Sequence, residues 1–140
     1  MIPLVLAAAA AATGLIGWSW WRGAGRLKPG SGERIRPREV ALPEDAFGPV
    51  GTMLLFGSRQ DERTDLARAR LEGMVDGIPG VVLAEVDLTA RGDLAGRYGV
   101  TRTPSLFALD GRGRLRARVK GATDTDTMRA ALDTVLRPAD

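Results

Sequence analysis

The sequence predicts an α/β domain with a central mixed sheet and flanking helices, preceded by one apolar N-terminal segment. Three observations support this fold class. Short apolar runs alternate with segments of helical spacing from about residue 50 onwards. A turn-forming GRG separates the last two apolar runs. The N-terminal segment has no charged residue before Arg22. A chain of 140 residues can hold one such core together with an appendage.

The first half of the domain reads as a β-α-β unit. TMLLF at residues 52–56 and VVLAEVDL at residues 81–88 are apolar runs typical of buried strands. Residues 61–76, which lie between them, predict a helix with an apolar stripe. That stripe comprises Ala67, Leu71, Met74, Val75 and Ile78. We expect the two strands to be parallel and joined by a right-handed crossover.

The second half predicts a short helix, a hairpin and a final helix. The short helix covers residues 93–98, and SLFALD begins a strand at Ser105. The GRG turn at 111–113 leads into the alternating strand RLRARVK, and residues 124–136 form the last helix. Its stripe is Met128, Ala131, Leu132, Val135 and Leu136. The predicted order is β-α-β-α-β-β-α, with helices on both faces of the sheet.

Residues 1–21 predict a transmembrane anchor. They carry no charge and, at about 1.5 Å per residue, are just long enough to cross a bilayer core of about 30 Å. A cleaved signal peptide is the alternative, but no basic residue precedes the apolar run, and Trp18, Trp20 and Trp21 cluster at its end. We therefore favour a retained single-pass anchor in the cell membrane.

Basic residues follow the anchor and predict its orientation. Residues 22–40 sum to +4, so the domain is expected on the cytoplasmic side. Residues 22–45 are rich in Arg, Gly and Pro and predict a flexible linker, which leaves 46–140 as the domain. Residues 41–140 sum to −1, which argues against a nucleic acid partner.

The composition excludes several kinds of chemistry. The chain has no Cys and no His, so it offers no thiol nucleophile, no disulfide and no imidazole base. Asp61, Glu62 and Asp65 could form an acidic site for a metal or for hydrolysis, but three carboxylates on five helical residues point in different directions. We expect no metal and no cofactor. The preferred role for Asp61 is to cap the helix that follows it.

The stretch VDLTARGDLAGRYGVTRTPSLFALDGRGRLRARVKGAT resembles the C-terminal half of thioredoxins. The matching features are a strand that ends in Val-Asp, a short helix that ends in Tyr-Gly-Val, and a Thr-Pro before the hairpin. The resemblance covers about residues 50–136 and implies a thioredoxin-like fold. Together with the apolar start and the Arg-rich segment, the whole chain resembles membrane-anchored thioredoxin-domain proteins of actinobacteria.

The resemblance also implies that the CxxC motif of thioredoxins is lost. Aligning Phe56 with the Phe of the family's strand puts Asp61 and Thr64 at the two cysteine positions. Leu55 replaces the family's buried carboxylate, and Gln60 stands at the position of its active-site Trp. Neither Asp nor Thr can form a disulfide, so dithiol oxidoreductase activity is excluded and a non-enzyme is expected.

Two further features of the sequence each have two interpretations. In the family, the residue before the cis-proline pairs with extended peptides, so Thr103, Pro104 and Gly121 are candidates for a peptide groove; the alternative is that the turn is retained only for the fold. A row of arginines is expected on one face of an edge strand, where it discourages aggregation or docks acidic protein or lipid headgroups. These are Arg112, Arg114, Arg116 and Arg118.

The sequence therefore predicts a membrane-anchored, redox-inactive thioredoxin-like domain. Its expected role is to bind a protein or peptide that is not yet identified, or to act as a scaffold, with membrane lipid contacted by the N-terminal helix. One alternative is an accessory domain that docks a cysteine-bearing redox protein at the membrane. Another is an enzyme of non-thiol chemistry that uses Asp61 and its neighbours.

Overall fold

The computed structural model describes residues 27–121 and 124–137, so the predicted anchor at 1–21 lies outside the described residues. Within the described part of the chain, no helix has the length and apolar character needed to cross a membrane. The elements are β1 (Leu27–Pro29), the 3-10 helix η1 (Pro37–Val40), β2 (Gly51–Gly57), α2 (Glu62–Val75), β3 (Val81–Asp87), α3 (Gly92–Tyr98), β4 (Ser105–Asp110), β5 (Leu115–Lys120) and α4 (Thr125–Leu136).

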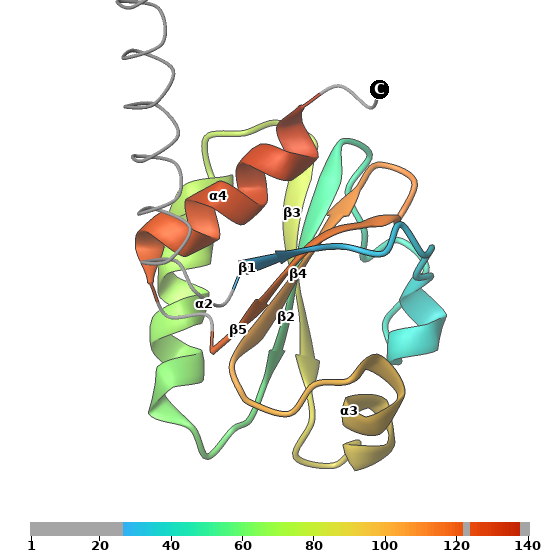
Figure 1. The fold of residues 1–140 in the computed structure, drawn as a ribbon, viewed down its shortest axis with the longest axis vertical. Coiled ribbons are helices and arrows are strands. Elements are labelled where there is room, and N and C mark those ends of the chain that lie inside the picture. Colours follow the sequence, from blue (N-terminus) through green and yellow to red (C-terminus); the bar gives the residue numbers. More distant parts are fainter. Residues whose placement is uncertain (1–26, 122–123, 138–140) are drawn as a thin grey trace, which may run out of the picture.

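The described strands form one five-stranded mixed sheet in the order β1-β5-β4-β2-β3 (Figure 1). β2 and β3 are parallel, with Gly51 opposite Val81 and Gly57 opposite Asp87. β4 pairs antiparallel with β2, and β5 pairs antiparallel with β4. The predicted β-α-β unit and the predicted hairpin are therefore confirmed, with element ends that differ from the prediction by at most one residue.

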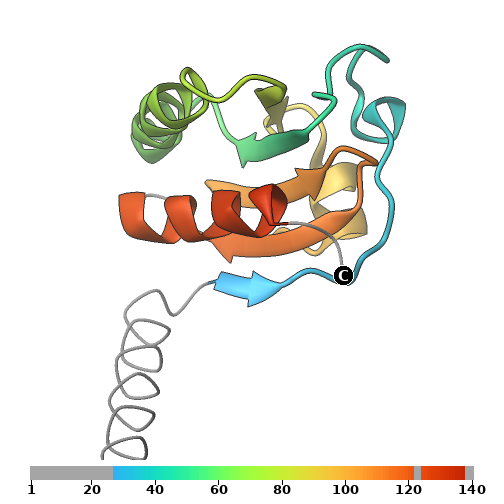
Figure 2. The same ribbon diagram turned by 90° about the horizontal axis from the view of Figure 1, so that it is seen from above.

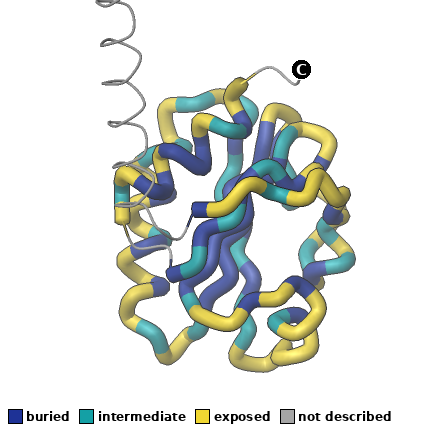
Figure 3. The backbone as a smooth tube through the Cα atoms, in the orientation of Figure 1, coloured by how far each residue is buried: buried dark blue, intermediate teal, exposed yellow. Residues whose placement is uncertain are grey.

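Helices cover both faces of this sheet, as predicted (Figure 2). Successive side chains of β2 point to opposite faces, so Met53 and Leu55 pack with α2 and α4, whereas Leu54 and Phe56 pack with α3 and η1. All seven residues of β2 are buried. Figure 3 shows the buried residues concentrated along the central strands. The sheet thus separates two apolar cores. The turn that follows β2 therefore begins at the end of a buried central strand.

Part of the predicted linker belongs to the fold. β1 pairs antiparallel with β5, and the pairing continues beyond β1 through hydrogen bonds from the N–H groups of Gly30 and Gly32 to β5 carbonyls. A Cβ at Gly30 would lie 2.3 Å from the Leu115 carbonyl oxygen, so this glycine permits a close backbone approach. Leu27–Pro29 therefore add a strand to the sheet, and Arg34 forms a further bridge to Arg114, although the sequence placed these residues in the linker.

Two apolar side chains fix the same segment. Ile35 and Val40 each have 1% of their surface exposed and belong to the core on the α3 side of the sheet. Ile35 N–H also donates to the Gly113 carbonyl of the hairpin. Burial of these two side chains stabilises the segment's attachment, since each removes a large apolar surface from water.

The structure differs from the predicted row of four arginines on one face of an edge strand. β1 covers β5, so the edges of the described sheet are β1 and β3. The β4–β5 register shifts between Ala108 and Leu109, and this bulge breaks the simple alternation along β5. Arg118 turns to the α3 side, where its guanidinium lies 4.8 Å from the Phe107 ring centroid and donates to the Tyr98 carbonyl at 2.8 Å.

Candidate functional site

The turn between β2 and α2 is tied to the loop that follows β3. Asp61 N–H donates to the Ser58 carbonyl at 3.1 Å, and Arg59 N–H donates to the Thr89 hydroxyl at 3.2 Å. The Arg59 guanidinium also lies 2.7 Å from the Asp87 carboxylate. Hydrogen bonds from Thr89, with a smaller contribution from Arg59, lower the pKa of Asp87. The turn is therefore held in place from two neighbouring segments.

Asp61 caps helix α2 and contacts the proline loop. Its carboxylate accepts from the Arg63 N–H at 3.0 Å and from the Arg63 guanidinium at 3.1 and 3.2 Å. It also accepts from the Thr103 hydroxyl at 3.1 Å. The side-chain hydrogen bond from Arg63 is the main reason that the pKa of Asp61 lies below its ordinary value, with the Thr103 hydroxyl acting in the same direction. Asp61 is thus an ionised acceptor already engaged by three kinds of donor.

Thr64 lies in the first turn of α2 and is buried, with 1% of its surface exposed. Its hydroxyl accepts from the Ser58 N–H at 3.2 Å, which ties the helix back to the end of β2. A Cβ at Gly57 would lie 2.2 Å from the Thr64 methyl group, so the two residues pack without spare room. The Thr64 side chain therefore packs between α2 and the end of β2, and its hydroxyl is hydrogen-bonded rather than accessible.

The Thr103–Pro104 peptide bond is cis, and Pro104 is buried. Thr103 is half-buried, and neither its backbone N–H nor its carbonyl is hydrogen-bonded to another described residue. Gly121, the third candidate for the groove, follows β5 directly and is buried in a left-handed conformation with φ of 61°. The Thr103 backbone therefore offers a donor and an acceptor beside the β2–α2 turn.

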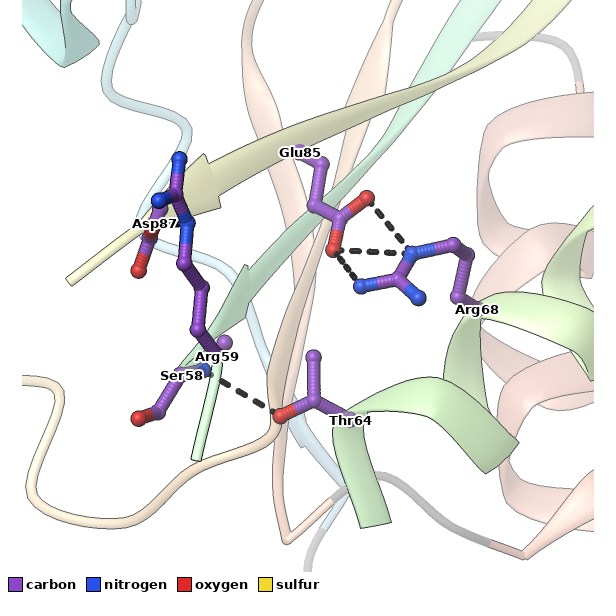
Figure 4. Close-up of a pocket in the computed structure, with 7 residues that line it drawn as sticks. Ser58, Arg59, Thr64, Arg68, Glu85 and Asp87 are labelled. Atoms are coloured by element: carbon purple, nitrogen blue, oxygen red, sulfur yellow. Dashed lines mark hydrogen bonds and ion pairs between the residues drawn. The ribbon is translucent and has the colours of Figure 1, made fainter. Parts of the chain in front are cut away.

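A cavity of about 330 Å³ lies beside the same turn, between α2 and β3 (Figure 4). Arg68 of α2 reaches across it and donates to both oxygens of Glu85 on β3, at 2.8 Å for the shorter Nε contact. Arg68 also pairs with Asp65 at 2.9 Å, and these two carboxylates raise the pKa of Arg68. The other residues that line the cavity are Gly57, Ser58, Arg59, Thr64 and Asp87.

The acidic residues at the start of α2 do not gather into a site. Asp61 is turned toward Thr103, Asp65 is paired with Arg68, and Glu62 is exposed. Among residues 27–121 and 124–137, no group of three or more His, Cys, Asp or Glu side chains could hold a metal ion. The arrangement gives no geometric support to the alternative of acid-base or metal chemistry at this turn.

The structure brings together Asp61, Thr64 and Thr103, three of the five residues chosen from the sequence. It adds the ion pair between Arg68 and Glu85, which the sequence analysis did not identify. A signal for it exists, because Glu85 is the one charged residue inside the otherwise apolar run VVLAEV. An acidic residue in a strand covered by a helix requires a partner on that helix.

Comparison with known proteins gives the class of the fold. The chain matches no protein-family model and no curated protein. A designed protein is similar over 81% of this chain and 98% of its own, with 24% identity and a TM-score of 0.58. A mutant thioredoxin from Halobacterium salinarum shares 17% identity over 64% of this chain and 78% of its own, with a TM-score of 0.54. Thioredoxin F from spinach chloroplast shares 14% identity over 64% and 80%, with a TM-score of 0.55.

These similarities show a thioredoxin-like fold. The mixed sheet with helices on both faces agrees with it, so the fold class predicted from the sequence is confirmed for the domain. The chain has no cysteine, and the turn between β2 and α2 presents a hydrogen-bonded carboxylate and a buried threonine. A thiol-disulfide oxidoreductase mechanism has no nucleophile here.

Proposed function

We propose that this chain is a membrane-anchored thioredoxin-like domain without redox activity that binds a protein or peptide. The observation that carries the proposal is the structural role of Asp61 and Thr64, the residues that the resemblance assigns to the two cysteine positions. Asp61 caps α2 and accepts from the Thr103 hydroxyl, and Thr64 is buried against Gly57. Both side chains contribute to the structure of the turn, and neither is available as a nucleophile.

The binding role is supported by the loop beside this turn. The Thr103 N–H and carbonyl have no hydrogen-bond partner among the described residues, and the preceding residue, Arg102, is exposed. An extended peptide could satisfy both backbone groups by strand-like pairing, a mode of recognition that needs no cysteine. The Asp61 carboxylate would then hold the Thr103 side chain away from the peptide.

Membrane attachment is supported by the sequence. Residues 1–21 are uncharged, and six basic residues follow within 22–40. This charge distribution favours a single span with the domain on the cytoplasmic side. An anchored domain without catalytic groups fits the role of a recruitment or scaffold module.

Site-specific crosslinking in native membranes tests the binding role. A photo-crosslinking amino acid is introduced in place of Arg102, beside the Thr103 backbone, and separately in place of Arg129, which is exposed on α4. We expect a discrete crosslinked product from position 102 and none of the same mass from position 129. Identical products from both positions, or no product from position 102, would contradict the proposed surface.

The redox part of the proposal is tested by insulin reduction with the purified full chain. We expect turnover no greater than that of the thiol reagent alone, because the chain contains no sulfur nucleophile. Turnover well above that of the thiol reagent alone would contradict the proposal that the domain has no redox activity.

A further inference from the structure

Arginines from two distant segments meet at the end of the sheet opposite the β2–α2 turn. A cavity of about 680 Å³ lies there, between the start of β2, the β4–β5 hairpin and the residue that follows α4. Four arginines line it, together with Pro49, Val50, Asp110 and Gly111. The arginines are Arg112, Arg114, Arg116 and Arg137.

The one carboxylate in the lining is already occupied. Asp110 accepts from the backbone N–H groups of Arg112 and Arg114 at 2.9 and 3.0 Å, which holds the hairpin turn. Its other oxygen lies 4.0 Å from the Arg116 guanidinium. Within the described residues, the guanidinium groups of Arg112, Arg114 and Arg137 pair with no carboxylate. The cavity therefore has an excess of positive charge.

More arginines surround an adjoining hollow. Arg34 and Arg36 line it with Arg112, opposite the single carboxylate of Glu44. The backbone brings them there, because Arg34 pairs with Arg114 across the strands. The basic segment that follows the predicted anchor and the basic hairpin thus converge on one end of the domain.

The chemistry of this cavity matches clustered phosphate groups. Each guanidinium is planar, permanently charged and able to donate two parallel hydrogen bonds to phosphate oxygens. A volume of about 680 Å³ is in the range of sites for small molecules, which run from about 300 to 1,000 Å³. Several arginines that line one cavity favour a small anion with several charges over a singly charged group.

The geometry also favours a soluble source of phosphate over the membrane that would hold the anchor. The first described residue, Leu27, pairs with Val119 near the far end of β5, whereas Arg34 pairs with Arg114 at the hairpin. The first described residue therefore lies several residues along β5 from the cavity. Each residue of a strand adds about 3.3 Å to that distance.

We propose that the cavity formed by Arg112, Arg114, Arg116 and Arg137 binds a soluble small molecule that carries two or more phosphate groups. This site is separate from the β2–α2 turn and from the peptide surface proposed above. Because the two surfaces share no lining residue, the phosphorylated molecule and a peptide partner would not compete for the same side chains.

Titration calorimetry with inorganic tripolyphosphate tests the site. The full chain is kept in a nonionic detergent at low salt and neutral pH, and it is expected to bind with a stoichiometry of one. Arg114→Gln/Arg137→Gln should bind at least about tenfold more weakly, since the loss of one hydrogen bond to a charged group is already enough for a factor of about ten. Arg112→Gln serves as a second variant and should weaken binding in the same direction.

The matched control is Arg70→Gln/Arg129→Gln, which removes the same charge from exposed helix positions outside the cavity. Its affinity should stay within about twofold of the wild type. Equal weakening by the control, or no binding of tripolyphosphate, would overturn the proposal. So would binding only to micelles that contain phosphatidylserine, or only to a hexaglutamate peptide, since these would assign the surface to a membrane or to an acidic protein.

Discussion

The Asp61 carboxylate accepts a hydrogen bond from the Thr103 hydroxyl at 3.1 Å, although the two residues are 42 positions apart. This contact joins the start of α2 to the residue that precedes the cis-proline. The same carboxylate caps α2 through the Arg63 N–H. One side chain thus connects the two loops that the thioredoxin resemblance associates with thiol chemistry, and it does so with oxygen atoms alone.

The charge on Asp61 makes the stability of the domain dependent on pH. Its pKa is lower in the folded chain, chiefly because of Arg63, so the stabilisation is present above the ordinary value of 3.8 and is lost as the pH falls further. Wild type should melt a few degrees above Asp61→Asn at pH 7, and this gap should close in acid. Thermal unfolding followed by circular dichroism measures it. A gap that stays constant as the pH falls would contradict an ionised Asp61 in this role.

The contact between Gly57 and Thr64 predicts a large effect for a single methyl group. Gly57→Ala would bring the new Cβ to 2.2 Å from the Thr64 methyl, and we expect it to lower the free energy of unfolding by about 1 to 3 kcal/mol. Gly73→Ala on α2 is the control, because no atom lies within 4 Å of its new Cβ; it should stabilise the chain by about 0.5 to 1 kcal/mol. Urea unfolding measures both.

A second variant identifies the clashing group. Thr64→Ser removes the methyl and keeps the hydroxyl that accepts from Ser58, so adding it to Gly57→Ala should recover part of the lost stability. Two outcomes would show that the turn is packed differently: a Gly57→Ala variant as stable as wild type, or a double variant with no recovery.

The ion pair between Arg68 and Glu85 should hold α2 against β3. Both side chains are about one third exposed, at 35% and 34%, so a double-mutant cycle with Arg68→Ala and Glu85→Ala should give a coupling energy of about 0.5 to 1 kcal/mol. The coupling should shrink at about 1 M salt because the pair is partly screened by solvent. Additive effects of the two substitutions at low salt would mean that the pair does not connect the helix to the strand.

The proposed membrane attachment and orientation of the chain can be tested with reporters fused after residue 140. A fluorescent protein should be fluorescent there, and alkaline phosphatase should be inactive, because basic residues after a span stay on the cytoplasmic side. Replacing Arg22 and Arg26 by Gln should increase the minority orientation by reducing that bias. An active phosphatase fusion to the unchanged chain would contradict the cytoplasmic placement.

The regular elements were predictable from the sequence because each carries its signal locally. The apolar run of β2 and the spaced stripe of α4 identify their elements without reference to the rest of the chain. The cap at Asp61 was also predictable, since the residue before the first helical turn needs a side-chain acceptor.

The parts that the sequence did not predict depend on contacts between distant residues. β1 is only three residues long, and Ile35 and Val40 are isolated apolar residues in a basic segment. The segment lies against the sheet because β1 pairs with β5, and this long-range contact cannot be inferred from the local sequence. The bulge at Ala108 and Leu109 likewise redirects the arginines of β5 in a way that simple alternation cannot anticipate. The unpaired Thr103 backbone follows from the three-dimensional course of its loop.

The most direct test of the proposed turn is the pair of substitutions Asp61→Cys and Thr64→Cys in one chain. If the two positions correspond to the cysteines of thioredoxins, the new side chains lie at the first turn of α2, within reach of one another and near the positive end of the helix dipole. Titration of free thiols in the folded protein after mild oxidation is the measurement. We predict that both thiols are lost into a disulfide that reductant restores; two free thiols in a natively folded chain would contradict the assignment of Asp61 and Thr64 to those positions.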